Sequence, residues 1–176
     1  MSKEQLFDML QLSFVPRWVI SRNARPQSVA EHSYNVAAMA AYLAKVAGID
    51  QQRAMILGMF HDIAEARTGD LPYPVKGLIE HQNAEDNLCP WYREIIDQFD
   101  PAEKLVVKLA DLLEAVWFLS HSGGPTSWQS AEDIISNHQG RIDTKICYAV
   151  RNSVVTVEQA QQLTGTATAL IKEFIK

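Results

Sequence analysis

Cysteine is scarce in this sequence, which has only Cys89 and Cys147 among its 176 residues. Two distant cysteines cannot build the disulfide framework of a small secreted domain, and they are not spaced as a metal-binding pair. We therefore expect both to be reduced thiols without a special role.

Long apolar runs are also missing. No stretch approaches the roughly 18 residues that a membrane-spanning helix needs. The N-terminal sequence MSKEQLFDMLQLSF mixes charged and apolar residues at helical spacing, so it lacks the uninterrupted apolar stretch of a signal peptide. The sequence therefore favours a cytoplasmic protein with no membrane partner.

Basic charge is low, because 16 Lys and Arg face 21 Asp and Glu and leave a net charge of −5. This balance argues against a general nucleic-acid binder, which usually presents a net basic face. It does not exclude a small anionic ligand, since a local basic cluster or a metal ion can reverse the field inside one pocket. With 47% hydrophobic residues, the chain is typical of one globular domain spanning residues 1–176.

Strand patterns are absent as well, and nearly every segment has helical periodicity. Ser2 with Gln5 and Ser28 with Glu31 are capping-box signals that predict helix starts. The expected helices cover residues 2–13, 29–47, 51–66, 91–99, 101–121, 129–137 and 156 to the C-terminus, with loops at 69–77 and 122–127. The sequence thus predicts an all-α, single-domain helical bundle.

One short stretch is unusually rich in ligand-type side chains. FHDIAEARTGDLP, residues 60–72, places His61, Asp62, Glu65 and Asp70 within ten residues. An isolated helix face does not need that density of such groups. What they do depends on which other residues the fold brings to them.

Two further residues complete a candidate metal site. His32 is expected near the start of its helix, and Asp111 lies in the most apolar helix, where nothing local satisfies its charge. Each residue alone has an ordinary explanation, as a satisfied core histidine or a solvent-facing aspartate. Together with His61 and Asp62 they form a mixed nitrogen and oxygen ligand set that suits Zn²⁺, Mn²⁺, Fe²⁺ or Co²⁺. Such a set leaves positions for water and substrate, as in a hydrolytic site.

The order His, His-Asp, Asp on successive helices resembles the HD-domain phosphohydrolase superfamily. The blocks PRWVISRNARPQSVAEHS (16–33) and FHDIAEARTGDLPYPVK (60–76) resemble its 5′-deoxynucleotidase branch. In length the chain is similar to compact bacteriophage members that act as dATP triphosphohydrolases, which remove the whole triphosphate. The resemblance implies an HD-domain helical bundle that acts on deoxynucleotides.

The resemblance also implies roles for the ligand-type residues. His32, His61, Asp62 and Asp111 would hold a divalent transition metal (Zn²⁺, Co²⁺ or Mn²⁺), and a second ion such as Mg²⁺ stays open. The ion would polarise a phosphoryl oxygen and lower the pKa of a bound water. Glu65, expected on the same side of one helix as Asp62, would orient or deprotonate the attacking water. The ordinary alternative for Glu65 is a solvated carboxylate at a helix end.

Candidate phosphate and sugar contacts follow from the same two blocks. Arg17 and Lys76 match positions that grip phosphate, and Asp70 matches the residue that probes the sugar. A turn-forming aspartate is the alternative for Asp70. Arg22 and Arg25 are further phosphate candidates, although solvated side chains or ion pairs within the loop explain them equally well.

Candidate base contacts are Trp18, Ile20 and Pro74. Trp18 could stack on a purine, or it could be a core tryptophan. Ile20 and Pro74 could pack near the purine edge and leave no room for a 2-amino group, although Pro74 could serve only the loop shape. The remaining histidines and tryptophans are expected at the surface, in the core or between subunits: His81, His121, His138, Trp91, Trp117 and Trp128.

Three functions remain open on the sequence. The leading one is a dATP triphosphohydrolase that produces deoxyadenosine and triphosphate. The second is a 5′-deoxynucleotidase that releases phosphate from dAMP and other deoxynucleoside monophosphates. The third is a non-catalytic helical module that binds a nucleotide or a partner. The resemblance further implies a homo-oligomer, dimeric or hexameric, in the host cytoplasm if the chain is viral.

Overall fold

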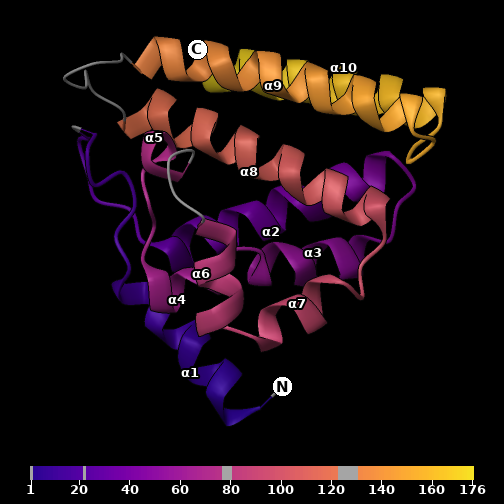
Figure 1. The fold of residues 1–176 in the computed structure, drawn as a ribbon. Coiled ribbons are helices and arrows are strands. Elements are labelled where there is room, and N and C mark those ends of the chain that lie inside the picture. Colours follow the sequence, from indigo (N-terminus) through magenta and orange to yellow (C-terminus); the bar gives the residue numbers. More distant parts are fainter. Residues whose placement is uncertain (1, 22, 77–80, 123–130) are drawn as a thin grey trace.

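The computed structural model describes residues 2–21, 23–76, 81–122 and 131–176. No strand occurs among them, and an isolated antiparallel bridge joins Pro16 to Ser28. The elements are α1 (Lys3–Gln11), the 3-10 helix η1 (Leu12–Phe14), α2 (Val29–Val46), α3 (Gln51–Phe60), α4 (Glu65–Thr68), α5 (Tyr73–Lys76), α6 (His81–Leu88), α7 (Trp91–Ile96), α8 (Pro101–Ser122), α9 (Ala131–Arg151) and α10 (Val157–Phe174) (Figure 1). None of these helices combines the length and apolarity that crossing a membrane requires. The predicted all-α helical bundle is confirmed.

The helix starts follow the capping signals only in part. At α1, Ser2 Oγ accepts a hydrogen bond from the Gln5 N–H at 3.2 Å, and Gln5 Oε1 accepts one from the Ser2 N–H at 2.7 Å. At α2, Ser28 Oγ accepts from the Glu31 N–H at 3.2 Å. The Glu31 carboxylate, however, binds the Arg25 guanidinium at 2.6 Å. The second box is therefore half formed, because a cation takes the side chain that would complete it.

Two helix boundaries differ from the prediction. The helix expected over 51–66 ends at Phe60, and α9 continues to Arg151 instead of ending at 137. Three residues prolong the buried side of α9 at helical spacing: Ile142, Ile146 and Ala149. Gly140 does not interrupt α9, since it lies at a helical position with open space around it. Helix α6 was not predicted at all.

Helix α8 lies at the centre of the bundle, between the α2–α3 pair and the α9–α10 pair (Figure 1). One of its sides carries Leu109, Leu113 and Val116, which are fully buried in the main apolar core. The other side carries Asp111 and Glu114. The same helix therefore contributes to the core and to a polar site.

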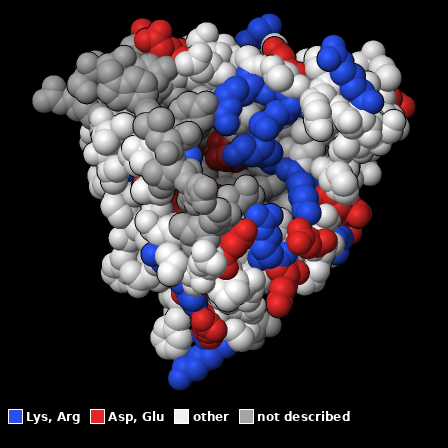
Figure 2. Space-filling model, in the orientation of Figure 1, with Lys and Arg blue, Asp and Glu red and all other residues white. Residues whose placement is uncertain are grey.

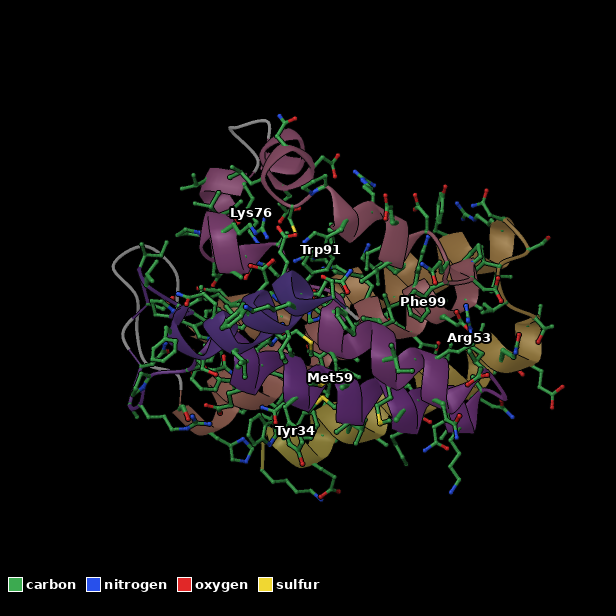
Figure 3. The ribbon with its side chains drawn as sticks, turned by 90° about the horizontal axis from the view of Figure 1, so that it is seen from below. Tyr34, Arg53, Met59, Lys76, Trp91 and Phe99 are labelled. Atoms are coloured by element: carbon green, nitrogen blue, oxygen red, sulfur yellow. The ribbon has the colours of Figure 1, made fainter. Side chains whose placement is uncertain are left out.

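Helices α2 and α3 approach closely at Gly58. A Cβ at this position would lie 2.7 Å from the Ala37 Cα, so any side chain here would force the helices apart. Near the N-terminal end of α3, the Arg53 guanidinium lies 5.0 Å from the centre of the Phe99 ring. Figure 3 shows this pair at the end of the molecule away from Lys76. The close crossing thus fixes α3 against α2 near the polar site.

Candidate active site

A cavity of about 690 Å³ opens between α8, α9 and the segments 17–21 and 70–76. Figure 2 shows basic side chains gathered on one face of the molecule, beside acidic atoms that lie deeper. The charged and titratable residues that line the cavity are Arg17, Asp62, Glu65, Asp70, Lys76, Lys108, Asp111, His138 and Arg141. Helices distant in the sequence therefore supply one shared polar pocket.

Four of the predicted residues meet at the floor of this cavity. His32 Nε2 lies 3.4 Å from Asp62 Oδ2 and 3.4 Å from Asp111 Oδ1. His61 Nε2 lies 3.2 Å from the same Asp62 oxygen. Ligand atoms of His32, His61 and Asp111 all fall within 4.8 Å of one another. We refer to these four residues as the His/Asp cluster.

Both imidazoles of the cluster are held in a ligand-type tautomer. His32 Nδ1 donates to Glu114 Oε2 at 2.7 Å, and His61 Nδ1 donates to the Gly58 carbonyl at 2.8 Å. Each Nε2 therefore faces the carboxylates of the cluster, where it can bind a proton or, in the proton's place, a metal ion, and both are buried without a hydrogen-bond partner among the described residues. Atoms that bind an ion at about 2.1 Å lie roughly 3.0–3.4 Å apart in octahedral or tetrahedral sites. The orphaned nitrogens and the spacing of the cluster thus fit a divalent transition ion.

Glu114 supports the cluster from below and was missed by the sequence analysis. This fully buried carboxylate accepts hydrogen bonds from His32, from Gln27 Nε2 at 2.5 Å and from Asn35 Nδ2 at 3.1 Å. Gln27 Oε1 in turn accepts the indole N–H of Trp18 at 2.8 Å. A chain of hydrogen bonds therefore connects Trp18 to His32. In the sequence, the sign of Glu114 is that it is a second carboxylate, three residues after Asp111, in an apolar helix.

The prediction that nothing local satisfies Asp111 is wrong. Lys108, one turn earlier on α8, pairs with Asp111 Oδ2, whereas Oδ1 faces His32. Burial raises the pKa of Asp111, but the Lys108 ammonium and the imidazoles lower it well below its usual value. Burial and a neighbouring guanidinium lower the pKa of His32, but the surrounding carboxylates raise it overall, to about 10. The cluster is thus an environment that attracts positive charge.

The segment between α3 and α4 is a tight turn and not the continuous helix that was expected. The Glu65 N–H bonds to the Asp62 carbonyl at 3.0 Å, which is an i→i+3 contact. The Tyr92 hydroxyl donates to the His61 carbonyl at 2.7 Å and holds the turn from α7. Because the turn stays compact, Asp62 and Glu65 still line one cavity although they do not share a helix.

Glu65 is only 1% exposed, so it is not the solvated carboxylate at a helix end that was its ordinary alternative. Its Oε1 accepts a hydrogen bond from Lys76 Nζ at 2.7 Å, while its Oε2 is buried without a partner among the described residues. Burial, reinforced by Asp62 and Asp70, raises the pKa of Glu65 to about 8 despite the Lys76 ammonium. The arrangement leaves one carboxylate oxygen at the cavity that can take a proton near neutral pH.

Arg17 and Lys76 face each other across Asp70. Arg17 Nε lies 3.7 Å from Asp70 Oδ2, and Lys76 Nζ lies 3.7 Å from Asp70 Oδ1. Arg17 Nε and Nη1 are buried and make no hydrogen bond within the described residues. Two cations that still have N–H groups free to donate therefore border the cluster.

An apolar end of the cavity surrounds Trp18. Its backbone is left-handed, with φ 59°, and its ring stacks on Phe118 at 6.0 Å between centroids and 4° between planes. Trp18 is half-buried and also lines the cavity, so it is both a packing residue and a wall. Ile20, 47% exposed, and Pro72 line the same end, whereas the Pro74 side chain lies outside the described residues.

The model of the HD-domain family matches residues 9–117, a range that contains the whole His/Asp cluster. The chain belongs to the HD-domain family.

Relatives of this HD domain include curated enzymes. A 5′-deoxynucleotidase of Klebsiella pneumoniae (strain ATCC 700721 / MGH 78578) is 40% identical over 64% of this chain and 70% of its own length. The 5′-deoxynucleotidase YfbR of Escherichia coli (strain SMS-3-5 / SECEC) is 40% identical over 58% of this chain and 64% of its own length. The resemblance inferred from the two sequence blocks is thereby confirmed.

A solved structure also resembles this HD domain. The HD phosphohydrolase DatZ of cyanophage S-2L, bound to dA and one catalytic Zn²⁺ ion, superposes with a TM-score of 0.81 and 26% identity. The superposition covers 95% of this chain and 96% of that chain. Nearly the whole helical bundle is therefore shared.

Several other side chains of the HD domain can now be placed. His138, which was expected at the surface or between subunits, is half-buried and lines the cavity. Arg25 forms the ion pair with Glu31, one of the two alternatives left open for it. His121 is exposed, and its Nδ1 donates to the Trp117 carbonyl at 2.7 Å. Arg22, Trp128 and the His81 side chain lie outside the described residues.

Trp91 and Trp117 are half-buried against apolar clusters.

Proposed function

We propose that this chain is a metal-dependent phosphohydrolase that converts dATP and water into deoxyadenosine and triphosphate. The observation that carries the proposal is the likeness to DatZ over 95% and 96% of the two chains. The match to the 5′-deoxynucleotidases covers a smaller part, 64% of this chain and 70% of the Klebsiella relative.

In this proposal the His/Asp cluster holds the catalytic ion. His32, His61, Asp62 and Asp111 supply two neutral nitrogens and two carboxylates, a set that accepts Zn²⁺, Co²⁺ or Mn²⁺. The DatZ structure contains Zn²⁺, which supports that ion, while a second ion such as Mg²⁺ stays a prediction. A bound divalent ion supplies positive charge at the phosphoryl group and makes water more acidic.

Glu65 is proposed to take the proton of the attacking water. Its Oε1 is held by Lys76, and its Oε2 has no partner among the described residues and is available for that proton. A pKa of about 8 suits a group that accepts a proton from water and then returns it to a leaving oxygen. Water attacks the α-phosphorus, the bond to the 5′-oxygen breaks, and that oxygen leaves with a proton. Arg17 and Lys76 neutralise the charge that develops on the phosphoryl oxygens.

The apolar end of the cavity is proposed to select the nucleoside. Trp18 contacts the purine, and Ile20 and Pro74 restrict the space at its edge. Asp70, which is held between Arg17 and Lys76, is proposed to contact the sugar. Equal turnover of dATP and dGTP would contradict the role given to Ile20 and Pro74.

The second candidate is a 5′-deoxynucleotidase, and the 40% identity to such enzymes favours it. The two reactions break the same bond, between phosphorus and the 5′-oxygen. They differ in what else the phosphorus carries, which is a diphosphate tail in dATP and nothing in dAMP. The His/Asp cluster suits both, so the products must decide between them.

One product assay tests both candidates. The protein is loaded with Mn²⁺ or Co²⁺ and incubated with dATP and dAMP in separate tubes, and phosphorus products are identified by ³¹P NMR. Triphosphate from dATP with dAMP intact is the expected result. Orthophosphate from dAMP with dATP intact would replace the first candidate by the second. No product from either tube would leave the non-catalytic binding module.

Homo-oligomer formation stays a prediction. Helix α1 and the turn after it expose large apolar side chains, including Phe7 at 58% and Phe14 at 78%, which is the kind of surface that a second copy can cover. Light scattering on the eluting protein gives its mass, and a monomer would contradict the prediction.

A further inference from the structure

Gln27 is a buried polar residue to which the proposed chemistry assigns no role. It is 2% exposed and lies in the segment just before α2, two residues ahead of Val29. It is not among the residues that line the cavity, so it does not touch a substrate there. Burying an amide costs free energy unless the amide is hydrogen-bonded. The contacts of Gln27 therefore indicate what it does.

Both ends of the Gln27 amide are used, each in the one way that its neighbour allows. Gln27 Oε1 accepts the Trp18 indole N–H at 2.8 Å, and Gln27 Nε2 donates to Glu114 Oε1 at 2.5 Å. An indole can only donate, and an ionised carboxylate can only accept, so a bridge between them needs one acceptor and one donor. A glutamine amide supplies both groups. The two contacts thus fix the orientation of the amide and connect Trp18 to Glu114.

The main chain of Gln27 supports the same part of the cavity. The Gln27 carbonyl accepts a hydrogen bond from the Arg17 N–H at 2.9 Å. The antiparallel bridge between Pro16 and Ser28 pairs the neighbouring residues of the same two segments. Arg17 and Trp18 therefore extend from a stretch of backbone that is anchored at Gln27.

Trp18 needs such support, because its backbone conformation is unfavourable. Its φ of 59° lies in the left-handed region, which bulky residues rarely adopt. The ring stacks on Phe118 with 4° between the planes, and the Arg17 guanidinium lies 5.5 Å from the ring centre. Stacking restrains the plane of the ring, whereas the hydrogen bond to Gln27 decides which ring edge points inward.

At the other end of the chain of hydrogen bonds, Glu114 orients the imidazole of His32. Glu114 Oε2 accepts from His32 Nδ1 at 2.7 Å, whereas Oε1 accepts from Gln27 at 2.5 Å and from Asn35 at 3.1 Å. Two donors on Oε1 oppose rotation of the carboxylate, so Oε2 stays on His32. Groups that orient a metal-binding histidine influence metal affinity. Of the two donors on Oε1, Gln27 makes the shorter contact.

We propose that Gln27 is a positioning residue that couples the nucleoside end of the cavity to the metal site, so that the Trp18 indole N–H contributes to the metal affinity of the His/Asp cluster. The inference rests on the proposed function for what the two ends bind, and it adds the residue that connects them. Trp18 and His32 are then positioned as one unit, although neither touches the other's proposed ligand.

Metal affinity, measured without turnover, tests the coupling. Co²⁺ binding is measured by competition with a chelator on wild type, Gln27→Met, Trp18→Phe and the double variant. Methionine lacks the amide, and phenylalanine keeps an aromatic ring without the indole N–H. We expect Gln27→Met to weaken binding by about tenfold and Trp18→Phe by about threefold. The double variant should bind no more weakly than Gln27→Met, because both substitutions interrupt the same chain.

Two matched controls stand outside this chain of hydrogen bonds. Trp117→Phe removes an indole N–H from the apolar cluster that also contacts Trp18, and Gln161→Met removes an exposed amide on α10. Both should bind Co²⁺ as wild type does. The visible absorption of bound Co²⁺ depends on the geometry of its ligands, so the spectrum should change in Gln27→Met and stay the same in the controls. Trp18→Phe decides alone if thermal unfolding shows that Gln27→Met does not fold.

The outcomes separate this inference from the proposed function. Wild-type Co²⁺ affinity and spectrum in Gln27→Met and Trp18→Phe would overturn the inference even where dATP is hydrolysed. Losses that multiply in the double variant, or an equal loss in Trp117→Phe, would overturn it too, because the residues would then act separately or through general packing. The expected pattern without hydrolysis of dATP would support the inference and contradict the proposed reaction. A wild type that binds no Co²⁺ would contradict both.

Discussion

The His/Asp cluster, at the floor of the cavity, and the side of the cavity lined by Lys108, His138 and Arg141, which we call the α9 wall, both present polar side chains. The protein holds the two sets in different ways. On the floor, His32 and His61 are oriented by internal hydrogen bonds to Glu114 and to the Gly58 carbonyl. On the wall, Lys108 pairs with Asp111, and His138 Nδ1 donates to the Ile134 carbonyl at 2.8 Å. The two imidazole rings of the cluster are thus fixed by hydrogen bonds, whereas the wall presents the long cationic side chains of Lys108 and Arg141 to the cavity.

This difference fits what each region has to do. A metal and an attacking water need ligands held to a fraction of an ångström, which requires neighbours that lock each ring. Cations that attract an anionic substrate act through their charge, which tolerates long, mobile side chains. Substitutions on the floor should therefore have larger effects than substitutions on the wall, and their effects should depend on metal.

Asp111→Ala should have the largest effect. It removes one carboxylate from the His/Asp cluster and leaves the half-buried Lys108 without its partner. We expect dATP turnover to fall by roughly a thousandfold or more, with stoichiometric metal lost, because a missing ligand affects both binding and the transition state. Metal analysis and the ³¹P assay measure the two effects.

Asp143→Ala is the matched control, since Asp143 is exposed on α9. It should keep wild-type metal content and turnover. A module that only binds nucleotides would instead retain its function in Asp111→Ala. Retained turnover in that variant would remove Asp111 from the proposed ligand set.

Glu114→Gln should have the next largest effect. A glutamine places an amide NH₂ among donors from His32, Gln27 and Asn35, so at least one donor loses its acceptor. We expect metal affinity to fall by about 10–100-fold, as for other partners of metal-binding histidines. Excess metal should restore part of the turnover, which it cannot do in Asp111→Ala. Glu158→Gln, on the exposed side of α10, should behave as wild type.

The floor could be predicted from the sequence to a large extent. His32, His61 and Asp62 sit in two short blocks, Asp111 lies in the most apolar helix, and the order of the four resembles the family. The turn that breaks the helix at Phe60 could not be predicted, because a local i→i+3 bond and the Tyr92 hydroxyl decide it. Tyr92 is 31 residues from His61, so nothing in the local pattern indicates the contact.

The wall and the supporting carboxylate were harder to predict. Glu114 contacts His32 across 82 positions and Gln27 across 87 positions, and no periodicity reports such a pair. His138 has no ligand-type residues near it in the sequence, so nothing there connects it with the cavity that it lines. Contacts between distant helices, more than local patterns, therefore decide what the sequence does not reveal.

Gly58→Ala should act on the floor through packing alone. The new methyl group would lie 2.7 Å from the Ala37 Cα, and the Gly58 carbonyl is the acceptor that orients His61. We expect a loss of about 2 kcal/mol of unfolding free energy, as for other overpacked sites, and a Tm lower by about 4–8 °C. Gly165→Ala is the control, because its Cβ would meet nothing within 4 Å in α10. An equal Tm for the two variants would show that the α2–α3 crossing can absorb the methyl group.

A change of salt concentration should have the smallest effect, and it should act differently on the α9 wall and on the His/Asp cluster. Raising NaCl from about 0.1 M to about 1 M shortens the Debye length from about 10 Å to about 3 Å, which weakens interactions of solvent-accessible charges most. Affinity for inorganic triphosphate, the product of the proposed reaction, should therefore fall by roughly fivefold. Metal content should hold constant, because His32 is fully buried and its partner Glu114 is too. Titrations at both salt concentrations measure the first quantity, and elemental analysis after dialysis measures the second. A triphosphate affinity that does not change with salt would mean that direct hydrogen bonds, and not accumulated charge, hold this anion.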